Sequence, residues 1–179
     1  MRHRPGRPGG EDALSYGGLR DRVAALAGGM RTAGLQPGER VALLLHNGLA
    51  YVEAYLAAVA AGLAVVPLNV RLVREDYLHM LADSGSRMLV TAGEFLRRVP
   101  ELLEVDGLEV VDVDRDGLAA LAARGVPLAA PVDCAAEAPA SLMYTSGTTG
   151  ARRRWCSPTA RGNGSRAAPR RCWASGRTR

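Results

Sequence analysis

The sequence of 179 residues predicts an α/β fold, in which a mostly parallel β-sheet is flanked by helices. Two observations carry this prediction. Short and wholly apolar runs, such as residues 41–45 and 63–68, are typical of parallel strands that are buried on both faces. Between these runs lie longer segments whose apolar side chains recur at helical spacing. A hydrophobic content of 47% is sufficient for one domain with a buried core.

Three segments have the periodicity of helices with one buried face. Ser15 suits the N-cap of the first helix, and Gly34 suits the left-handed position after its end. The predicted buried face of this helix comprises Leu19, Val23, Leu26 and Met30. The second helix, residues 51–61, is predicted to bury Val52, Tyr55, Leu56 and Val59. The third, residues 74–83, ends near Gly85 and is predicted to bury Tyr77, Leu78 and Leu81.

The second half of the chain leads to a loop of unusual composition. Strands are predicted over residues 88–91 and 108–113, and a short helix over 117–123. Residues 125–140 are rich in Pro and Ala and are predicted to form a linker. Residues 142–144 then form a strand that runs directly into the loop. Ligands of parallel sheets bind at loops that follow the carboxyl ends of strands, so this loop is the candidate functional site.

The loop combines glycines with hydroxyl side chains. It comprises Thr145, Ser146, Gly147, Thr148, Thr149 and Gly150. Glycines allow backbone N–H groups to turn towards one point, and the hydroxyls add donors for phosphate oxygens. The chain contains no Lys, so the loop is not a Walker loop. Composition alone does not separate a phosphate-binding loop from a polar surface turn.

Cysteine content and the N-terminal sequence point to a cytoplasmic location. The three cysteines, Cys134, Cys156 and Cys172, are odd in number and lack the spacing of a disulfide framework. Residues 1–13 are predicted to be a disordered leader and lack the apolar segment of a secretory signal. No apolar run reaches the roughly 18 residues that a membrane span requires.

The remaining polar residues favour structural roles. His46 and His79 have no Cys or carboxylate at the spacing of a metal site, and both are interpreted as structural. The alternating acids Asp112, Asp114 and Asp116 are interpreted as a solvated turn, because no further oxygen ligands accompany them.

Several motifs, in matching order and spacing, resemble the adenylate-forming (AMP-binding) superfamily of acyl-CoA synthetases, aryl-CoA ligases, luciferases and nonribosomal adenylation domains. The loop 145–150 resembles the phosphate loop of that superfamily. Residues 14–19, 34–45, 61–72 and 81–85 resemble motifs that precede it. The variant Pro-Leu-Asn-x-Arg-Leu at residues 67–72 is closer to fatty-acid and other acyl-CoA ligases than to peptide-synthetase domains.

The resemblance implies that residues 14–150 are the N-terminal part of an AMP-binding domain, and that the chain is a fragment of an ATP-dependent acid–CoA ligase. Such an enzyme converts a carboxylic acid and ATP to an acyl-adenylate and pyrophosphate, and then forms a CoA thioester. It uses ATP, Mg²⁺ and CoA. The loop residues Thr145 to Gly150 would hold the β- and γ-phosphates, and no catalytic or metal-ligating residue is assigned. The family's later segments are missing, so the chain as given is expected to be inactive.

Residues 151–179 differ in charge from the rest of the chain. Residues 1–150 carry 14 Arg and 18 acids, whereas residues 151–179 carry nine Arg and no acid. One interpretation is a nucleic-acid-binding arm, with Trp155 and Trp173 available for stacking. The other is a disordered segment produced by a frameshift. In that case nucleic acid would bind only through non-specific charge.

Codons favour the frameshift. After the phosphate loop the family reads x-Pro-Lys-Gly, whereas this chain reads Ala-Arg-Arg-Arg at residues 151–154. The family-like text Ala-Pro-Lys-Ala-Val-Val-Leu-Thr-His can be encoded by GCG CCG AAG GCG GTG GTG CTC ACC CAC. Loss of one C from the Pro codon yields Ala-Arg-Arg-Arg-Trp-Cys-Ser-Pro-Thr, which is the sequence of residues 151–159.

Overall fold

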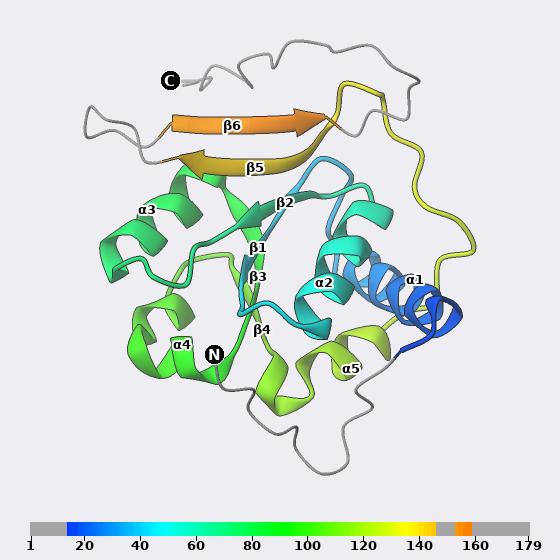
Figure 1. Cartoon of the computed structure of the whole chain (residues 1–179), viewed down its shortest axis with the longest axis horizontal. Coiled ribbons are helices and arrows are strands. Elements are labelled where there is room, and N and C mark those ends of the chain that lie inside the picture. Colours follow the sequence, from blue (N-terminus) through cyan, green and yellow to red (C-terminus); the bar gives the residue numbers. More distant parts are fainter. Residues whose placement is uncertain (1–13, 146–152, 159–179) are drawn as a thin grey trace, which may run out of the picture.

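A computed structural model describes residues 14–145 and 153–158. Its centre is a six-stranded sheet with the strand order β4-β3-β1-β2-β5-β6 (Figure 1). Each pairing among β1 to β5 is parallel, and β6 is antiparallel to β5. The predicted α/β fold with a mostly parallel sheet is therefore confirmed. The strands are β1 Arg40–Leu44, β2 Ala64–Pro67, β3 Ser86–Thr91, β4 Glu109–Asp112, β5 Pro139–Thr145 and β6 Arg153–Pro158.

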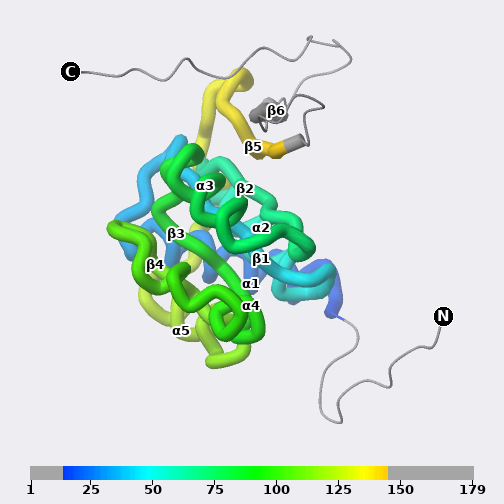
Figure 2. Tube along the Cα trace, turned by 90° about the vertical axis from the view of Figure 1, so that its left-hand side faces the viewer, coloured from blue at the N-terminus to red at the C-terminus, as the bar shows by residue number. Residues whose placement is uncertain are grey.

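Helices cover both faces of the sheet. The α-helices are α1 Tyr16–Thr32, α2 Leu49–Ala60, α3 Arg74–Ser84, α4 Gly93–Arg98 and α5 Gly117–Ala122, and the 3₁₀ helices are η1 Pro100–Leu103 and η2 Val113–Arg115. One face carries α1, α2 and α5, and the opposite face carries α3 and α4. Figure 2 shows the molecule from the side on which α3 and α4 lie.

The helix ends follow the predicted capping residues. The Ser15 hydroxyl oxygen accepts a hydrogen bond from the Gly18 N–H at 3.1 Å, which satisfies a free donor at the start of α1. Gly34 follows α1 with φ 93°, and Gly85 ends α3 with φ 60°. Both glycines occupy the left-handed region that other residues rarely adopt. The sequence therefore predicted these boundaries correctly.

Alternate side chains of the strands enter two separate cores. Val41 and Leu43 of β1 belong to the first core, which lies between the sheet and α1, α2 and α5. Ala42 and Leu44 belong to the second core, between the sheet and α3, α4 and η1. This division follows from the two-residue repeat of a strand, and it explains why the strand segments are apolar throughout.

The buried face of α2 differs from the prediction. Val52 and Leu56 are 41% and 40% exposed, whereas Ala54, Ala57 and Ala58 are fully buried. The helix is apolar on most of its circumference, so periodicity did not identify the inward face. Small side chains face the sheet and α1 because they allow the backbones to approach closely.

Two short helices in the second core have no signal in the helical periodicity of the sequence. These are α4 and η1, which bury Phe95 and Leu102 respectively. Each spans fewer than two turns, which is too short for a repeat of apolar positions to develop. Their place in the fold depends on the packing of these two side chains against the sheet.

The predicted linker carries no helix or strand between α5 and β5. Backbone hydrogen bonds nevertheless hold this linker against the helices of the first core. The Leu128 N–H donates to the Ala24 carbonyl at 3.0 Å, and the Val132 N–H donates to the Ala60 carbonyl at 2.8 Å. These bonds lead the chain along α1 and α2 to the start of β5.

The structure differs from the prediction for part of the tail. Residues 153–158 form β6, whereas the sequence predicted no regular structure from residue 151 onwards. The pairing runs from Thr145 opposite Arg153 to Pro139 opposite Pro158, so β5 supplies a template of backbone hydrogen-bonding groups. Residues 1–13 and 159–179 lie outside the described part of the chain. Within the described part, no helix is long and apolar enough to cross a membrane.

Candidate functional site

The predicted loop begins at the last residue of β5. Thr145 ends this strand, and Ser146, Gly147, Thr148, Thr149 and Gly150 lie outside the described residues. Because β1 to β5 are parallel, their carboxyl ends lie on the same edge of the sheet. Thr145 therefore shares this edge with the last residues of β1 to β4, which are Leu44, Pro67, Thr91 and Asp112. Loops at this edge are where ligands of such sheets bind.

Tyr144 is anchored to α3 immediately before the loop. Its hydroxyl donates a hydrogen bond to Asp83 Oδ2 at 2.6 Å and lies 3.5 Å from the Met80 carbonyl oxygen. Its ring packs against the second core. Sequence reasoning did not single out this pair, because the two residues are separated by 61 positions and no local pattern connects them.

The connection that follows β2 is also held in place. The Asn69 side-chain oxygen accepts from the Arg71 N–H at 2.9 Å, which closes a short turn. The buried Tyr77 donates its hydroxyl to the Asn69 carbonyl at 3.1 Å and accepts from Arg98 at 2.7 Å. Burial raises the pKa of Tyr77, which favours the protonated hydroxyl that donates this bond. These bonds give the Pro-Leu-Asn-x-Arg motif a structural role.

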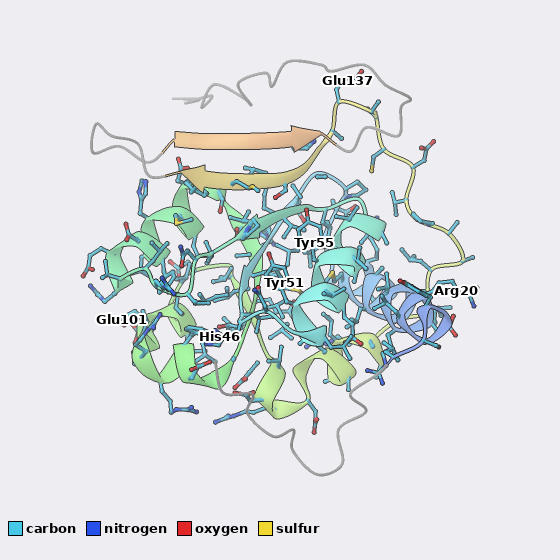
Figure 3. All side chains as sticks on the ribbon, in the orientation of Figure 1. Arg20, His46, Tyr51, Tyr55, Glu101 and Glu137 are labelled. Carbon is cyan, nitrogen blue, oxygen red and sulfur yellow. The ribbon has the colours of Figure 1, made fainter. Side chains whose placement is uncertain are left out.

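His46 and His79 are exposed on the surface. His46 follows β1, where Nε2 lies 3.0 Å from Glu94 Oε1 and the ring lies 5.3 Å from that of Phe95 (Figure 3). His79 is exposed on α3. The contacts with Glu94 and Phe95 give His46 a place in the packing of α4 against the end of β1.

The acidic turn after β4 is used for hydrogen bonding within the fold. Asp112 Oδ1 accepts from the Asp114 N–H, and Asp114 Oδ2 accepts from the Gly93 N–H, both at 3.0 Å. Among residues 14–145 and 153–158, no group of three or more His, Cys, Asp or Glu could hold a metal ion.

A groove of about 990 Å³ lies between α1, α2 and the linker. Leu19, Val23 and Val59 contribute apolar side chains, and Ala140 also lines the groove. Ala140 is at the amino end of β5, whereas the loop follows the carboxyl end. The groove is therefore separate from the candidate site.

The described residues define an α/β protein with a mostly parallel sheet, and a hydroxyl- and glycine-rich run of sequence follows the carboxyl end of β5. Comparison with known proteins identifies the family. The model of the AMP-binding enzyme family matches residues 2–153, and the chain belongs to this family.

The similar proteins include several ligases. Feruloyl-CoA synthase from Amycolatopsis sp is 42% identical over 141 residues, which cover 79% of this chain and 27% of that protein. A 4-hydroxybenzoate–CoA/benzoate–CoA ligase from Rhodopseudomonas palustris is 33% identical and is likewise covered to 27%. The crystal structure of a benzoate CoA ligase from Burkholderia xenovorans LB400 superimposes with a TM-score of 0.72 and 25% identity, covering 81% of this chain and 29% of that one. The chain thus spans about a quarter of the length of the curated relatives it matches.

Proposed function

We propose that this chain forms the part of an AMP-forming acid–CoA ligase that holds the phosphates of ATP. The observation that carries the proposal is the run from Thr145 to Gly150, which starts at the carboxyl end of β5 in a chain of the AMP-binding enzyme family. The loop hydroxyls and backbone N–H groups are donors for the β- and γ-phosphate oxygens. Such donors stabilise the negative charge that moves onto pyrophosphate during the reaction.

The proposed reaction has two steps. A carboxylate oxygen attacks the α-phosphorus of ATP, and the bond to the pyrophosphate oxygen breaks, which gives acyl-adenylate and pyrophosphate. The CoA thiolate then attacks the acyl carbonyl carbon, so that a thioester forms and AMP leaves. When bound, Mg²⁺ would neutralise phosphate charge. No described residue is assigned to the metal or to either chemical step. A cytoplasmic location, where ATP and CoA are available, belongs to the same proposal.

Exchange between ATP and pyrophosphate tests the first step. The gene, with the family reading frame restored after Gly150, should yield a protein that incorporates labelled pyrophosphate into ATP only when a carboxylic acid is present. No exchange with a broad set of aliphatic and aromatic acids would refute the assignment.

A polypeptide of these 179 residues should form no CoA thioester, because it spans about a quarter of the similar ligases and carries Arg where the family has the Lys after the loop. Thioester analysis by mass spectrometry checks this expectation. Product formed by the purified chain, and absent from a preparation of the empty expression host, would contradict it.

We also propose that residues 151–179 result from a change of reading frame. The absence of acids and the codon relation at residues 151–159 support this origin. The nucleotide sequence beyond the Gly150 codon, read in all three frames, decides the question: family-like text should appear one frame away.

The rival function for residues 151–179 is a nucleic-acid-binding arm, and it differs from a frameshifted tail in how the chain should bind DNA. If residues 151–179 are a frameshifted tail, their nine arginines should bind DNA with a steep dependence on salt and no preference among sequences. Filter binding over a series of salt concentrations measures both properties. Tight, sequence-selective binding at physiological salt that disappears on removal of residues 151–179 would favour the rival.

A further inference from the structure

The last residues of β5 extend beyond the parallel part of the sheet. Among the described residues, Val65 opposite Ser141 is the one register pair between β2 and β5. From Leu142 to Thr145 the strand partner is β6 alone. The pairing with β2 therefore ends at Ser141, and the residues from there to the start of the phosphate loop are held by the pairing with β6 and by side-chain contacts.

Tyr144 provides such a contact. Its side chain is half-buried, the ring packs on the second core, and the hydroxyl lies 2.6 Å from Asp83 Oδ2. A short hydrogen bond from a hydroxyl to a carboxylate is among the stronger ones in proteins. In Figure 1 the end of β5 lies over α3, the helix that carries Asp83. The bond joins the residue next to the loop to a helix on the face of the sheet.

The position of Asp83 is unfavourable for α3 itself. Asp83 is in the last turn of the helix, which contains no basic residue. A carboxylate there faces the negative end of the helix dipole, where a cation would stabilise the helix. Helix stability therefore does not explain an Asp at this position, whereas a hydrogen bond to Tyr144 does.

We propose that Tyr144 and Asp83 form a tether that positions the phosphate loop. This proposal rests on the proposed function of residues 145–150. Both are positioning residues and touch no reacting atom. With the tether in place, the start of the loop is held before the nucleotide arrives, so less conformational entropy is lost on binding. The tether also couples the loop to the second core and leaves the first core unaffected.

Hydrogen exchange measured by mass spectrometry tests the tether and the loop separately. The 179-residue chain is compared with Tyr144→Phe, Asp83→Ala and the double variant, with and without sodium tripolyphosphate as the probe. Tyr144→Phe keeps the ring in the core and removes only the hydroxyl. Peptides that cover residues 142–150 report on the loop itself, so tripolyphosphate bound by the Arg-rich tail does not enter the measurement.

Without the probe, each single variant should exchange these amides about tenfold faster, the size expected from loss of one hydrogen bond to a charged group. The double variant should be no faster than either single one, because both remove the same bond. Tyr55→Phe on α2, on the opposite face of the sheet, is the matched control and should leave the loop unchanged. The melting temperature of Tyr144→Phe should stay close to that of the original chain.

With tripolyphosphate, the original chain should protect residues 145–150, and the tether variants should require about tenfold more probe for the same protection. Equal exchange and equal protection in all variants would overturn the tether and leave the proposed function intact. Faster exchange in the variants, with no protection of the original chain, would support the tether and refute the phosphate loop. Faster exchange throughout the chain would mean that the pair only stabilises the fold, and would also overturn the proposal.

Discussion

The helices on the two faces of the sheet pack differently, although both cores contain large side chains, such as Met30 in the first and Met80 in the second. In the first core, α2 presents Ala54, Ala57 and Ala58 to its neighbours, and α1 contributes Gly28 and Gly29. In the second core, the helices contribute the large side chains of Tyr77, Met80, Phe95 and Leu102.

This difference determines how each face is stabilised. An added Cβ on Gly28 would collide with the Val126 carbonyl oxygen, and one on Gly29 with that of Leu121. Where α1 meets α5 and the linker, the first core therefore depends on space that Gly28 and Gly29 leave free for the neighbouring backbone. The second core depends on the volume that its side chains fill, and it is the face to which the ring of Tyr144 connects the loop.

Phe95→Ala should have the largest effect on stability. Phe95 is the only phenylalanine in the chain, is 2% exposed and lies in the second core, so truncation leaves a cavity that the short helix α4 cannot close. The free energy of unfolding should fall by about 3–5 kcal/mol in urea denaturation. Leu56→Ala on the exposed side of α2 is the control and should cost far less. Equal losses would show that the second core does not depend on volume.

Gly29→Ala tests the close approach in the first core. The methyl group would meet the backbone of α5, and the unfolding free energy should fall by about 1–3 kcal/mol in spite of the better helix propensity of Ala. Gly17→Ala in the first turn of α1 is the matched control, since its Cβ would meet nothing closer than 3.9 Å. That change should stabilise the protein by up to about 1 kcal/mol. Stabilisation by both substitutions would contradict the close packing.

Two neighbouring positions on α2 test which side of this helix faces the first core. Leu56→Gln should change the unfolding free energy by about 0.5 kcal/mol or less, because the side chain is on the surface. Ala57→Gln, one residue further on, places a larger polar group in the first core and should destabilise by several times as much. If thermal unfolding showed Leu56→Gln to be the more destabilising substitution, the inward face of α2 would be the one that the sequence predicted.

The ion pair between α3 and η1 should have the smallest effect. The pKa of Glu101 is lowered first by a hydrogen bond from its own backbone N–H and then by Arg74, whose Nε lies 2.7 Å from Oε1. A lowered pKa stabilises the folded state above the ordinary pKa of the carboxyl group, and this stability is lost as the pH falls through the lowered value. Arg74→Gln should raise the pKa of Glu101 in an NMR titration and leave the melting temperature nearly unchanged, since the pair is exposed. An unchanged titration would exclude the ion pair in solution.

Sequence reasoning succeeded where the physical cause is local. Ser15, Gly34 and Gly85 mark helix ends through their own hydrogen bonds or backbone angles, and all three were predicted. It failed for α2, whose only charged residue, Glu53, is buried and paired with Arg22 of α1 at 3.1 Å. A helix that is apolar on most sides carries no information about which side meets the sheet.

For the candidate site, the sequence by itself determined the loop composition, its place after a strand and the family to which it belongs. The alternation of apolar runs with helical segments also determined a parallel sheet. Only the tertiary structure decided the strand order, the Ala-rich inward face of α2, the pairing of β6 and the contact of Tyr144 with Asp83. Apart from the pairing of β6 with the neighbouring strand β5, these features arise from packing between segments far apart in the chain, whereas sequence patterns record preferences over a few neighbouring residues.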